Sequence, residues 1–387
     1  MIIQVLFWFC IFAIFHSYVL YPLILHFLAA GKHENPNVYD LTDNLPQVSI
    51  LVAVYNEEAV IEEKIRSVFS GNYPLDKLEL IIGSDGSSDK TNAIIEKLSI
   101  EFNGLRLIPV NQRMGKGNVL NIIMKEAKHN LLVYTDAKVI FKSDTLFELI
   151  KNFKEPTIGL VGGKLLNKIY KPSGISIQEN AFMSREFIMK YQEGLIWGSM
   201  VGAYGALYTI RRNLVPVIPV SFIADDFYIT MKVFEGTDKV ILNPEAIGYL
   251  NVPNEMKEEF RRKVRIAKGN FQNLFAFLHL LHPIWRGKSF SYLSHKVLRW
   301  LGPFFILTVF ISNLFLLDKS EIYQLALYFQ IFLFIIPAVD YVLRKFGIHV
   351  LFLRFITHFY GMNAALLAGF INYLKGIKSN VWEPTRR

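Results

Sequence analysis

The sequence predicts an α/β domain, built on a mostly parallel sheet, that is inserted between an N-terminal transmembrane helix and C-terminal transmembrane helices. Three observations predict this fold class. Residues 1–30 contain no Lys, Arg, Asp or Glu and are long enough to span a membrane as an uncleaved anchor. From residue 47, short apolar segments alternate with amphipathic ones. Three long apolar runs follow, at 297–317, 322–343 and 355–373.

The composition agrees with a membrane protein that has a soluble part. Hydrophobic residues make up 52% of the 387 residues and charged residues only 19%, which is below the usual quarter. The formal net charge is +9, and basic residues gather beside apolar segments. We interpret this charge as facing a cytoplasmic membrane surface and expect no nucleic-acid partner. Cys10 is the only cysteine, which excludes an intramolecular disulfide and zinc sites of the CxxC type.

The same patterns divide the chain into parts. Each boundary follows a change from apolar to polar sequence, or from strand-helix alternation to long apolar runs. Residues 271–283 are apolar but too short to span, which suits a helix at the membrane interface. The predicted parts are an anchor at 1–30, an α/β domain at 47–275, the interfacial helix at 271–283, and a C-terminal region of about three hydrophobic helices at 297–376.

Within the α/β domain, strands and helices alternate along the chain. The segment at 48–54 is a continuous, largely β-branched run, as expected of a strand that is buried on both faces. Such alternation produces a parallel sheet with helices on both faces, and ligands bind at the carboxyl ends of its strands. The predicted strands are 48–54, 78–83, 105–110 and 131–135, and the predicted helices are 58–70, 90–98 and 117–127.

Acidic side chains follow three of these strands. The first strand is followed by 55–57 (YNE), the second by 84–89 (SDGSSD), and the fourth ends in 135–138 (TDAK). Any one of these carboxylates has an ordinary alternative role, as a turn residue or a helix N-cap. Three of them at one edge of one sheet predict a site that binds ribose hydroxyls, a uracil NH or a hard cation bridging phosphates.

Two further segments carry charge next to a predicted helix start. The loop 111–117 is glycine-rich, and its backbone NH groups together with Arg113 and Lys116 suit a diphosphate. It is not a P-loop, because no Ser or Thr follows the lysine. Asp225 and Asp226 are adjacent, so their repulsion is expected to raise the pKa of one of them, which suits a general base. The alternative role for Asp225 is a helix N-cap.

Six short motifs occur in order along the chain: YNE, SDGSSD, GKGNVLN, TDA, ADD and RRKVR. Together they resemble the family 2 glycosyltransferases, and among these the membrane-embedded bacterial synthases of cellulose, hyaluronan and poly-N-acetylglucosamine. The resemblance covers residues 47–275 and the flanking apolar segments. It implies a GT-A type catalytic domain that transfers a sugar from a nucleotide-sugar donor in one inverting displacement.

The resemblance also assigns the donor side of the site. In this family the YNE segment and the Asp of the DG turn hold the nucleotide, and these positions are Tyr55, Glu57 and Asp85 here. Asp136 matches the first Asp of the DxD metal-binding motif, so Mg²⁺ or Mn²⁺ is the expected cofactor. Lys138 stands at the third position, and a protonated lysine does not bind a cation. Either the metal rests on Asp136, the diphosphate and water, or Lys138 replaces part of its charge.

On the acceptor side, Asp226 matches the catalytic aspartate of the family's ED motif, which takes the proton from the acceptor hydroxyl. Gly205 lies in a stretch that resembles the family's acceptor segment, with an ordinary strand and turn as the alternative. Arg262 and Arg265 match the Q/RxxRW motif and would bind the diphosphate, or else carry membrane-surface charge. Ile266 replaces the tryptophan of that motif, which argues against processive polymerisation.

We therefore expect an inverting enzyme that moves a sugar, from a UDP-sugar, to a growing cell-envelope or extracellular polysaccharide. Two alternatives stay open, a membrane-lipid acceptor and an inactive scaffold subunit of a synthase complex. A transporter is disfavoured, because the C-terminal apolar runs carry almost no charge. The expected location is the inner cell membrane, multi-pass, with a cytoplasmic catalytic domain and export or synthase subunits as partners. The run at 355–373 is interpreted as a third C-terminal crossing rather than an interfacial helix.

Overall fold

The computed structural model describes residues 1–167, 176–250 and 256–377. The chain divides into two compact units, and each is treated by itself. The sheet unit comprises residues 28–170, 184–252 and 377–387, and the apolar unit comprises residues 1–27, 171–183 and 253–376.

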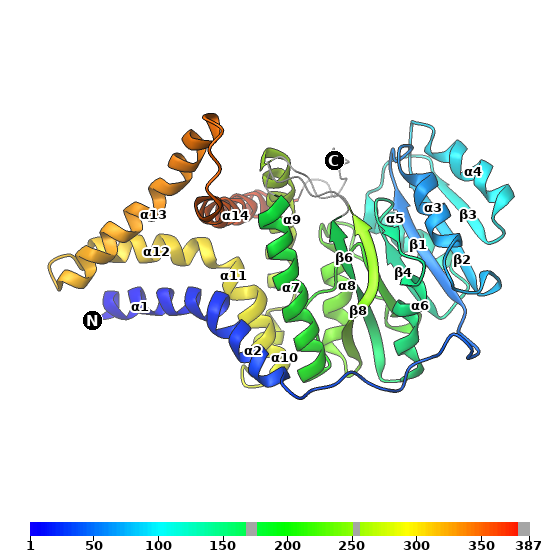
Figure 1. Ribbon diagram of the computed structural model, residues 1–387, viewed down its shortest axis with the longest axis horizontal. Coiled ribbons are helices and arrows are strands. Elements are labelled where there is room, and N and C mark those ends of the chain that lie inside the picture. The colour runs from blue at the N-terminus through cyan, green and yellow to red at the C-terminus, as the bar shows by residue number, and fades with distance from the viewer. Residues whose placement is uncertain (168–175, 251–255, 378–387) are drawn as a thin grey trace. The chain divides into compact units, whose positions relative to one another are not determined.

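The sheet unit contains an eight-stranded sheet in the order β3-β2-β1-β4-β7-β6-β8-β5 (Figure 1). The pairs β1-β2, β2-β3, β1-β4 and β6-β8 are parallel, whereas β7 and β5 pair antiparallel with their neighbours. The predicted α/β fold with a mostly parallel sheet is therefore confirmed. The strands are β1 Val48–Val54, β2 Leu78–Asp85, β3 Leu105–Val110, β4 Leu131–Thr135, β5 Ile140–Phe141, β6 Ile158–Asn167, β7 Leu207–Arg211 and β8 Lys239–Leu250.

Helices cover both faces of this sheet, because alternate side chains of a strand point to opposite faces. Ile50 and Val52 of β1 belong to one core cluster, together with Ile61 of α3. Leu51 of β1 belongs to a second cluster on the other face, together with Val119 of α5. Helices α3, α4 and α6 contribute to the first cluster, and α5 and α8 contribute to the second. These helices are α3 Ile61–Phe69, α4 Thr91–Glu101, α5 Lys116–Glu126, α6 Thr145–Ile150 and α8 Asp225–Glu235.

The observed bounds of β1, β3 and β4 match the predicted ones, and the helix bounds differ at their starts. Helix α3 begins at Ile61 rather than at residue 58. The backbone NH groups of Glu57 and Glu58 instead donate to Thr91 Oγ1 (2.9 Å) and Asp89 Oδ2 (3.1 Å), which ties this segment to the start of α4. Side chains distant in sequence thus bind amides that precede the helix and have no acceptor within it.

Among the described residues, three helical segments are long and apolar enough to cross a membrane by length and composition, and they lie almost entirely in the apolar unit. The first is the continuous stretch Ile2–Ala29, in which a π-helical turn, His16–Leu20, joins α1 Ile2–Phe15 to α2 Tyr21–Ala29. The others are α13 Glu321–Lys345 and α14 Leu351–Leu374.

A fourth apolar stretch is bent rather than straight. The predicted run at 297–317 is broken after α11 Leu298–Trp300, and α12 Gly302–Leu314 continues at an angle of 62° to the segment before it. Pro303 lies in the first turn of α12, where proline is tolerated, although in a longer helix it would remove a backbone hydrogen bond. The C-terminal part therefore holds two single candidate spans and one bent pair.

Residues 271–283 do not form a helix of their own. Residues up to 276 continue the long helix α9 Met256–Ala276, and a 3-10 turn, Leu278–Leu281, follows it. Ala267, Phe271 and Leu274 are all buried at helical spacing, so one apolar stripe extends through this part of α9. The predicted interfacial helix at 271–283 thus begins inside α9, a single amphipathic helix that ends at Ala276.

Helix α14 packs closely along α9. A side chain at Gly369 would meet Ala267 Cβ at 2.4 Å and the Val264 carbonyl oxygen at 2.9 Å, so only glycine permits this backbone approach. Phe271 and Phe370 place their ring centroids 4.9 Å apart. In Figure 1, α1 and α12 lie in the plane of the picture, whereas α14 is strongly foreshortened. Within the apolar unit, α14 therefore runs across the direction of these two helices.

Candidate active site

The parallel register of β1, β2 and β4 brings the three acidic segments to one edge of the sheet. Val54 at the end of β1 lies beside Ser84 of β2, and β4 flanks β1 on its other side. The segments that follow are tied together by hydrogen bonds, since the amide of Asn56 donates to Ser87 Oγ (3.1 Å) and the amide of Ser88 donates to Asn56 Oδ1 (2.9 Å). The predicted grouping of strand ends thus has a direct geometric basis.

Asp85 is fully buried and holds the glycine-rich loop. Its carboxylate accepts hydrogen bonds from the amides of Met114 (2.6 Å) and Gly115 (3.1 Å). Gly115 has φ +88°, a left-handed conformation that favours glycine, and it precedes the start of α5. Asp85 therefore shapes the loop in this structure, and its predicted contact with a nucleotide stays a prediction.

Arg113 of this loop lies against Tyr55 from the end of β1. Its guanidinium carbon is 3.5 Å from the centroid of the Tyr55 ring, and its Nε is 3.9 Å from Asp85 Oδ2. A cation over an aromatic face is held by the ring quadrupole. Two of the predicted donor-side residues, Tyr55 and Arg113, therefore form one stacked pair.

Two lysines pair with the acidic strand ends, and the partners differ from those considered in the sequence analysis. Lys116 Nζ lies 2.8 Å from Asp136 Oδ1, whereas Lys138 Nζ lies 3.3 Å from Glu57 Oε1. The lysine that pairs with the aspartate of the DxD-like motif is thus Lys116 and not Lys138. Burial by itself lowers the pKa of Lys116, but Asp136, Asp225 and Asp226 together raise it above its usual range.

The two adjacent aspartates at the start of α8 have different surroundings. Ala224 is the residue at the N-cap position, so Asp225 is not the cap. Asp225 is buried, and burial, together with the nearby Asp226, raises its pKa to about 6 in spite of the opposing charge of Lys116. The residue with the raised pKa is thus Asp225, whereas Asp226 is the more exposed of the two.

Gly205 lies directly against Asp226. A Cβ atom at position 205 would lie 2.1 Å from Asp226 Oδ2, which is far inside van der Waals contact. The carboxylate of Asp226 therefore occupies the space that any other residue at 205 would fill. The amide of Asp136 also donates to the carbonyl of Ala206 (3.3 Å), so this stretch adjoins both the metal-binding candidate and the candidate base.

The arginines that follow this stretch have structural partners. Arg211 donates to the backbone carbonyls of Ile158 (2.8 Å) and Phe153 (3.1 Å). Arg212 donates to the carbonyl of Ala127. Both guanidinium groups therefore tie β7 to neighbouring segments through main-chain oxygens.

The sequence analysis missed Lys64, which is fully buried behind the turn that carries Asp136. Its Nζ donates to Thr135 Oγ1 (3.0 Å) and to the Val139 carbonyl (2.7 Å). A signal was available, because Lys64 falls on the apolar face of its helix at helical spacing from Ile61 and Val68. Burial lowers the pKa of Lys64 well below its usual range, and the charge of Asp136 opposes this shift.

Arg262 and Arg265 lie on α9 in the apolar unit. The Arg262 guanidinium makes two hydrogen bonds to Glu259, at 2.9 and 2.7 Å, and lies 3.7 Å from Glu179. It therefore belongs to a cluster of opposite charges within that unit, while Arg265 lies on an exposed part of the helix. Diphosphate binding by these two arginines stays a prediction.

The described residues contain no group of three or more His, Cys, Asp and Glu side chains that could hold a metal ion. A carboxylate such as Asp136 is nevertheless a suitable ligand for a hard cation that also takes phosphate oxygens and water. The Asp136 side chain keeps 41% of its surface exposed. The donor set here thus fits a cation shared with a diphosphate rather than one caged by protein.

Comparisons with known proteins identify the family to which part of this chain is similar. Residues 49–215 match the family model of glycosyl transferase family 2. The chain is 23% identical over 317 residues to the probable glycosyltransferase YdaM of Bacillus subtilis, covering 78% of this chain and 74% of that protein. It is 28% identical over 240 residues to the poly-beta-1,6-N-acetyl-D-glucosamine synthase of Staphylococcus aureus, covering 60% of this chain. The match spans only 56% of the length of that synthase.

Among solved structures, the chain is similar to a mannosyltransferase from Pyrobaculum calidifontis in complex with GDP-mannose and Mn²⁺. The TM-score is 0.69 at 22% identity, covering 95% of this chain and 99% of that chain. This likeness shows the fold, a GT-A-like α/β domain accompanied by apolar helices. Residues 49–215 are therefore a family 2 glycosyltransferase domain, and the chain is a glycosyltransferase that resembles bacterial polysaccharide synthases.

Proposed function

We propose that this enzyme transfers a sugar, with inversion, from a nucleoside-diphosphate sugar to a growing polysaccharide at the cytoplasmic face of the cell membrane. The observation that carries the proposal is the group of Lys116, Asp136, Asp225 and Asp226, in which two carboxylates lie beside a lysine-carboxylate pair at the carboxyl edge of the sheet. A lysine that could stabilise the departing diphosphate thus lies next to a carboxylate that could accept the proton of the acceptor hydroxyl.

The donor diphosphate would lie at the loop that Asp85 holds. Lys116 is the first residue of α5, so the positive end of that helix dipole and the charge of the lysine belong to the same segment. The stacked Tyr55 and Arg113 offer a flat surface for the nucleotide. We retain a uridine nucleotide as the expected donor, although the mannosyltransferase of similar fold was solved with GDP-mannose.

We propose that Mg²⁺ or Mn²⁺ is held by Asp136 together with the diphosphate. When bound, such a cation neutralises charge that develops on the leaving diphosphate. Because Lys116 now pairs with Asp136, it must leave that carboxylate for a cation to bind there. The ammonium of Lys116 is then available to the phosphate oxygens of the donor.

Asp226 is the proposed general base. It would accept the proton of the acceptor hydroxyl as that oxygen forms a bond to the anomeric carbon and the bond from this carbon to the diphosphate oxygen breaks. One displacement inverts the anomeric configuration. Asp226 suits this role better than Asp225, because it is less buried and its carboxylate lies against Gly205 in the stretch that resembles the acceptor segment.

The acceptor is the finer part of the proposal. A polysaccharide acceptor is supported by the likeness to a poly-N-acetylglucosamine synthase and by the candidate membrane helices. A membrane-lipid acceptor is the second candidate, supported by Ile266 at the position where processive synthases carry tryptophan. We also propose export or synthase subunits as partners of this chain, in keeping with a polysaccharide product.

The test uses the full chain purified in detergent with a panel of UDP- and GDP-sugars, and it measures release of free nucleoside diphosphate. We expect turnover with one donor, and a loss of about 10² or more in kcat for Asp226→Asn with donor binding retained. The anomeric configuration of the product, read by NMR, tests inversion. No turnover with any donor by the wild type, or normal turnover by Asp226→Asn, would overturn the proposal.

A further inference from the structure

Lys64 is a buried charge that the mechanism above does not use. It lies on α3 among Ile61, Ile65 and Val68, and its side chain is 0% exposed. Among the described residues, no carboxylate lies within ion-pair distance of its ammonium group. Burial of an ammonium group costs free energy unless its N–H donors are hydrogen-bonded. The contacts of Lys64 therefore indicate its role.

All of these contacts are made with one short segment. The ammonium donates to Thr135 Oγ1 (3.0 Å) and the Val139 carbonyl (2.7 Å), and it lies 3.6 Å from the centroid of the Phe141 ring. Thr135 ends β4 and Phe141 ends β5. The ammonium therefore joins the two strands on either side of the turn at 136–138.

That turn presents both lysine-carboxylate pairs of the site. Asp136 meets Lys116, and Lys138 meets Glu57. The turn is closed from within by the amide of Val139, which donates to the Asp136 carbonyl (3.1 Å). Lys64 lies on the face of the sheet that α3 covers, and its two hydrogen bonds link the residues before and after the turn a second time. A shift of about 1 Å in such a turn is enough to cost a large factor in rate.

We propose that Lys64 is a positioning residue for donor binding: its buried ammonium, held between Thr135 and the Val139 carbonyl, fixes the turn that presents Asp136 and Lys138 to the donor diphosphate. This inference rests on the proposed function. A lysine suits the task because it combines a long unbranched stem, which passes through the core, with several donors at its tip. An apolar residue of equal length would fill the space but leave both acceptors without a donor.

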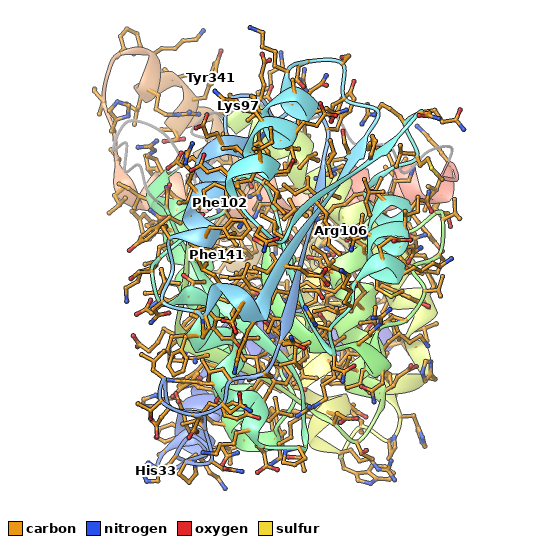
Figure 2. The ribbon with its side chains drawn as sticks, turned by 90° about the vertical axis from the view of Figure 1, so that its right-hand side faces the viewer. His33, Lys97, Phe102, Arg106, Phe141 and Tyr341 are labelled. Carbon is orange, nitrogen blue, oxygen red and sulfur yellow. The ribbon has the colours of Figure 1, made fainter. Side chains whose placement is uncertain are left out.

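The main test compares Lys64→Met with Lys97→Met. Methionine keeps a long unbranched stem and removes the ammonium, and Lys97 is an exposed lysine on the neighbouring helix α4, labelled in Figure 2 together with Phe141. Binding of UDP and GDP in the presence of Mn²⁺ is measured by calorimetry, Mn²⁺ binding by electron paramagnetic resonance, and kcat and KM on the best donor. We expect folded Lys64→Met to bind nucleotide and Mn²⁺ at least tenfold more weakly and to lose kcat at least tenfold, with Lys97→Met unchanged.

A merely structural role predicts a different result, namely a lower thermal midpoint with normal binding and kinetics per folded molecule. That result would overturn the inference. If Lys64→Met does not fold, Thr135→Val and Thr135→Ser decide the question. Serine keeps the acceptor hydroxyl and should stay near wild type, while valine should show the binding defect. Equal, normal constants for both would overturn the inference, whereas absence of donor turnover in the wild type would instead count against the proposed function.

Discussion

The sheet unit and the apolar unit each gather opposite charges, but they do so in different surroundings. At the strand ends, Asp136 keeps 41% and Lys116 28% of the side-chain surface exposed. In the apolar unit, Glu179 and Glu259 are almost fully buried, at 1% and 0%, against Arg262. A residue in an exposed ion pair can exchange its partner for a ligand at a small cost in free energy, whereas a residue in a buried cluster cannot.

The buried cluster joins three helices of the apolar unit. Glu179 on α7 Ser176–Trp197 accepts from Lys263 on α9 (3.2 Å) and contacts His358 Nε2 on α14 (2.9 Å). Burial alone would raise the pKa of Glu179, but the hydrogen bond to His358 and the charges of Lys263 and Arg262 lower it to about 2. Paired charges that are open to water can serve as a binding site, whereas paired charges that are buried hold helices together.

The largest expected effect comes from breaking the buried cluster. Glu179→Ala leaves Lys263 and Arg262 with one carboxylate fewer inside the protein, and we expect a loss of about 3–5 kcal/mol of stability. The thermal midpoint in detergent and the monodisperse fraction measure it. Glu258→Ala is the matched control, because its pair with Arg261 is far more exposed. Equal losses for the two variants would contradict the distinction drawn here.

The next effect concerns the space beside the candidate base. Gly205→Ala places a methyl group where the Asp226 carboxylate lies, so Asp226 must move. We expect kcat to fall by about 10² while donor affinity and thermal midpoint change little. Gly361→Ala is the control, because a side chain there meets nothing within 4 Å. Unchanged kcat in Gly205→Ala would separate Gly205 from the chemistry.

A smaller effect distinguishes the two lysines of the open site. Lys116→Met should raise the donor KM about tenfold or more, because a charge-assisted contact to the diphosphate is lost. The same change removes the group that competes at Asp136, so Mn²⁺ should bind without donor more tightly than in wild type. Lys138→Met should have the weaker effect on KM. A larger effect of Lys138→Met on KM would instead support Lys138 as the residue that replaces part of the metal's charge.

Asp225 gives a pH-dependent effect on stability. Its pKa of about 6 in the folded protein lies above its ordinary value of 3.8, so the folded state holds the proton more tightly than the unfolded chain does. The contribution of Asp225 to stability is therefore complete below about pH 4 and is lost as the pH rises through about 6. Asp225→Asn should raise the thermal midpoint by about 2–4 °C at pH 7.5, and the difference should shrink toward pH 5. A pH-independent difference would argue against this assignment.

The last prediction concerns the membrane topology of the chain rather than its stability or activity. Helix α14 is apolar enough to cross a membrane, yet it packs along α9, whose residues 257–268 are largely charged. Since charged helices do not lie in the hydrocarbon core, we expect α14 to lie at the cytoplasmic membrane surface rather than form a third crossing. Basic residues after α14 would then stay inside, as the positive-inside rule expects.

Cysteine labelling at Ser379 tests this topology. Ser379 and the basic residues Lys378, Arg386 and Arg387 lie outside the described residues, and the Cys10→Ser background removes the only native thiol. We expect an impermeant thiol reagent to leave Ser379→Cys unlabelled in intact cells and to label it after the membrane is opened. Labelling in intact cells would support a crossing, which is the alternative favoured by the sequence alone.

The local features of this protein could be predicted from its amino-acid sequence. The bounds of β1 and β4 could be predicted because a strand buried on both faces is a continuous apolar run with polar ends. The acidic segments could be placed at one edge because parallel strands end at the same edge. The candidate membrane helices also followed from length and hydropathy alone.

Which charged groups pair with one another could not be predicted from the sequence, because the partners come from distant segments that meet on folding. Strand β7 pairs antiparallel with β4 and brings the stretch containing Gly205 beside the Asp136 turn, which no local pattern indicated. The same long-range packing places Lys116 rather than Lys138 at Asp136, and it buries Asp225 more than Asp226. Sequence spacing defines a side chain's position on its own helix or strand, but its dielectric surroundings and its partners depend on elements that arrive from elsewhere in the chain.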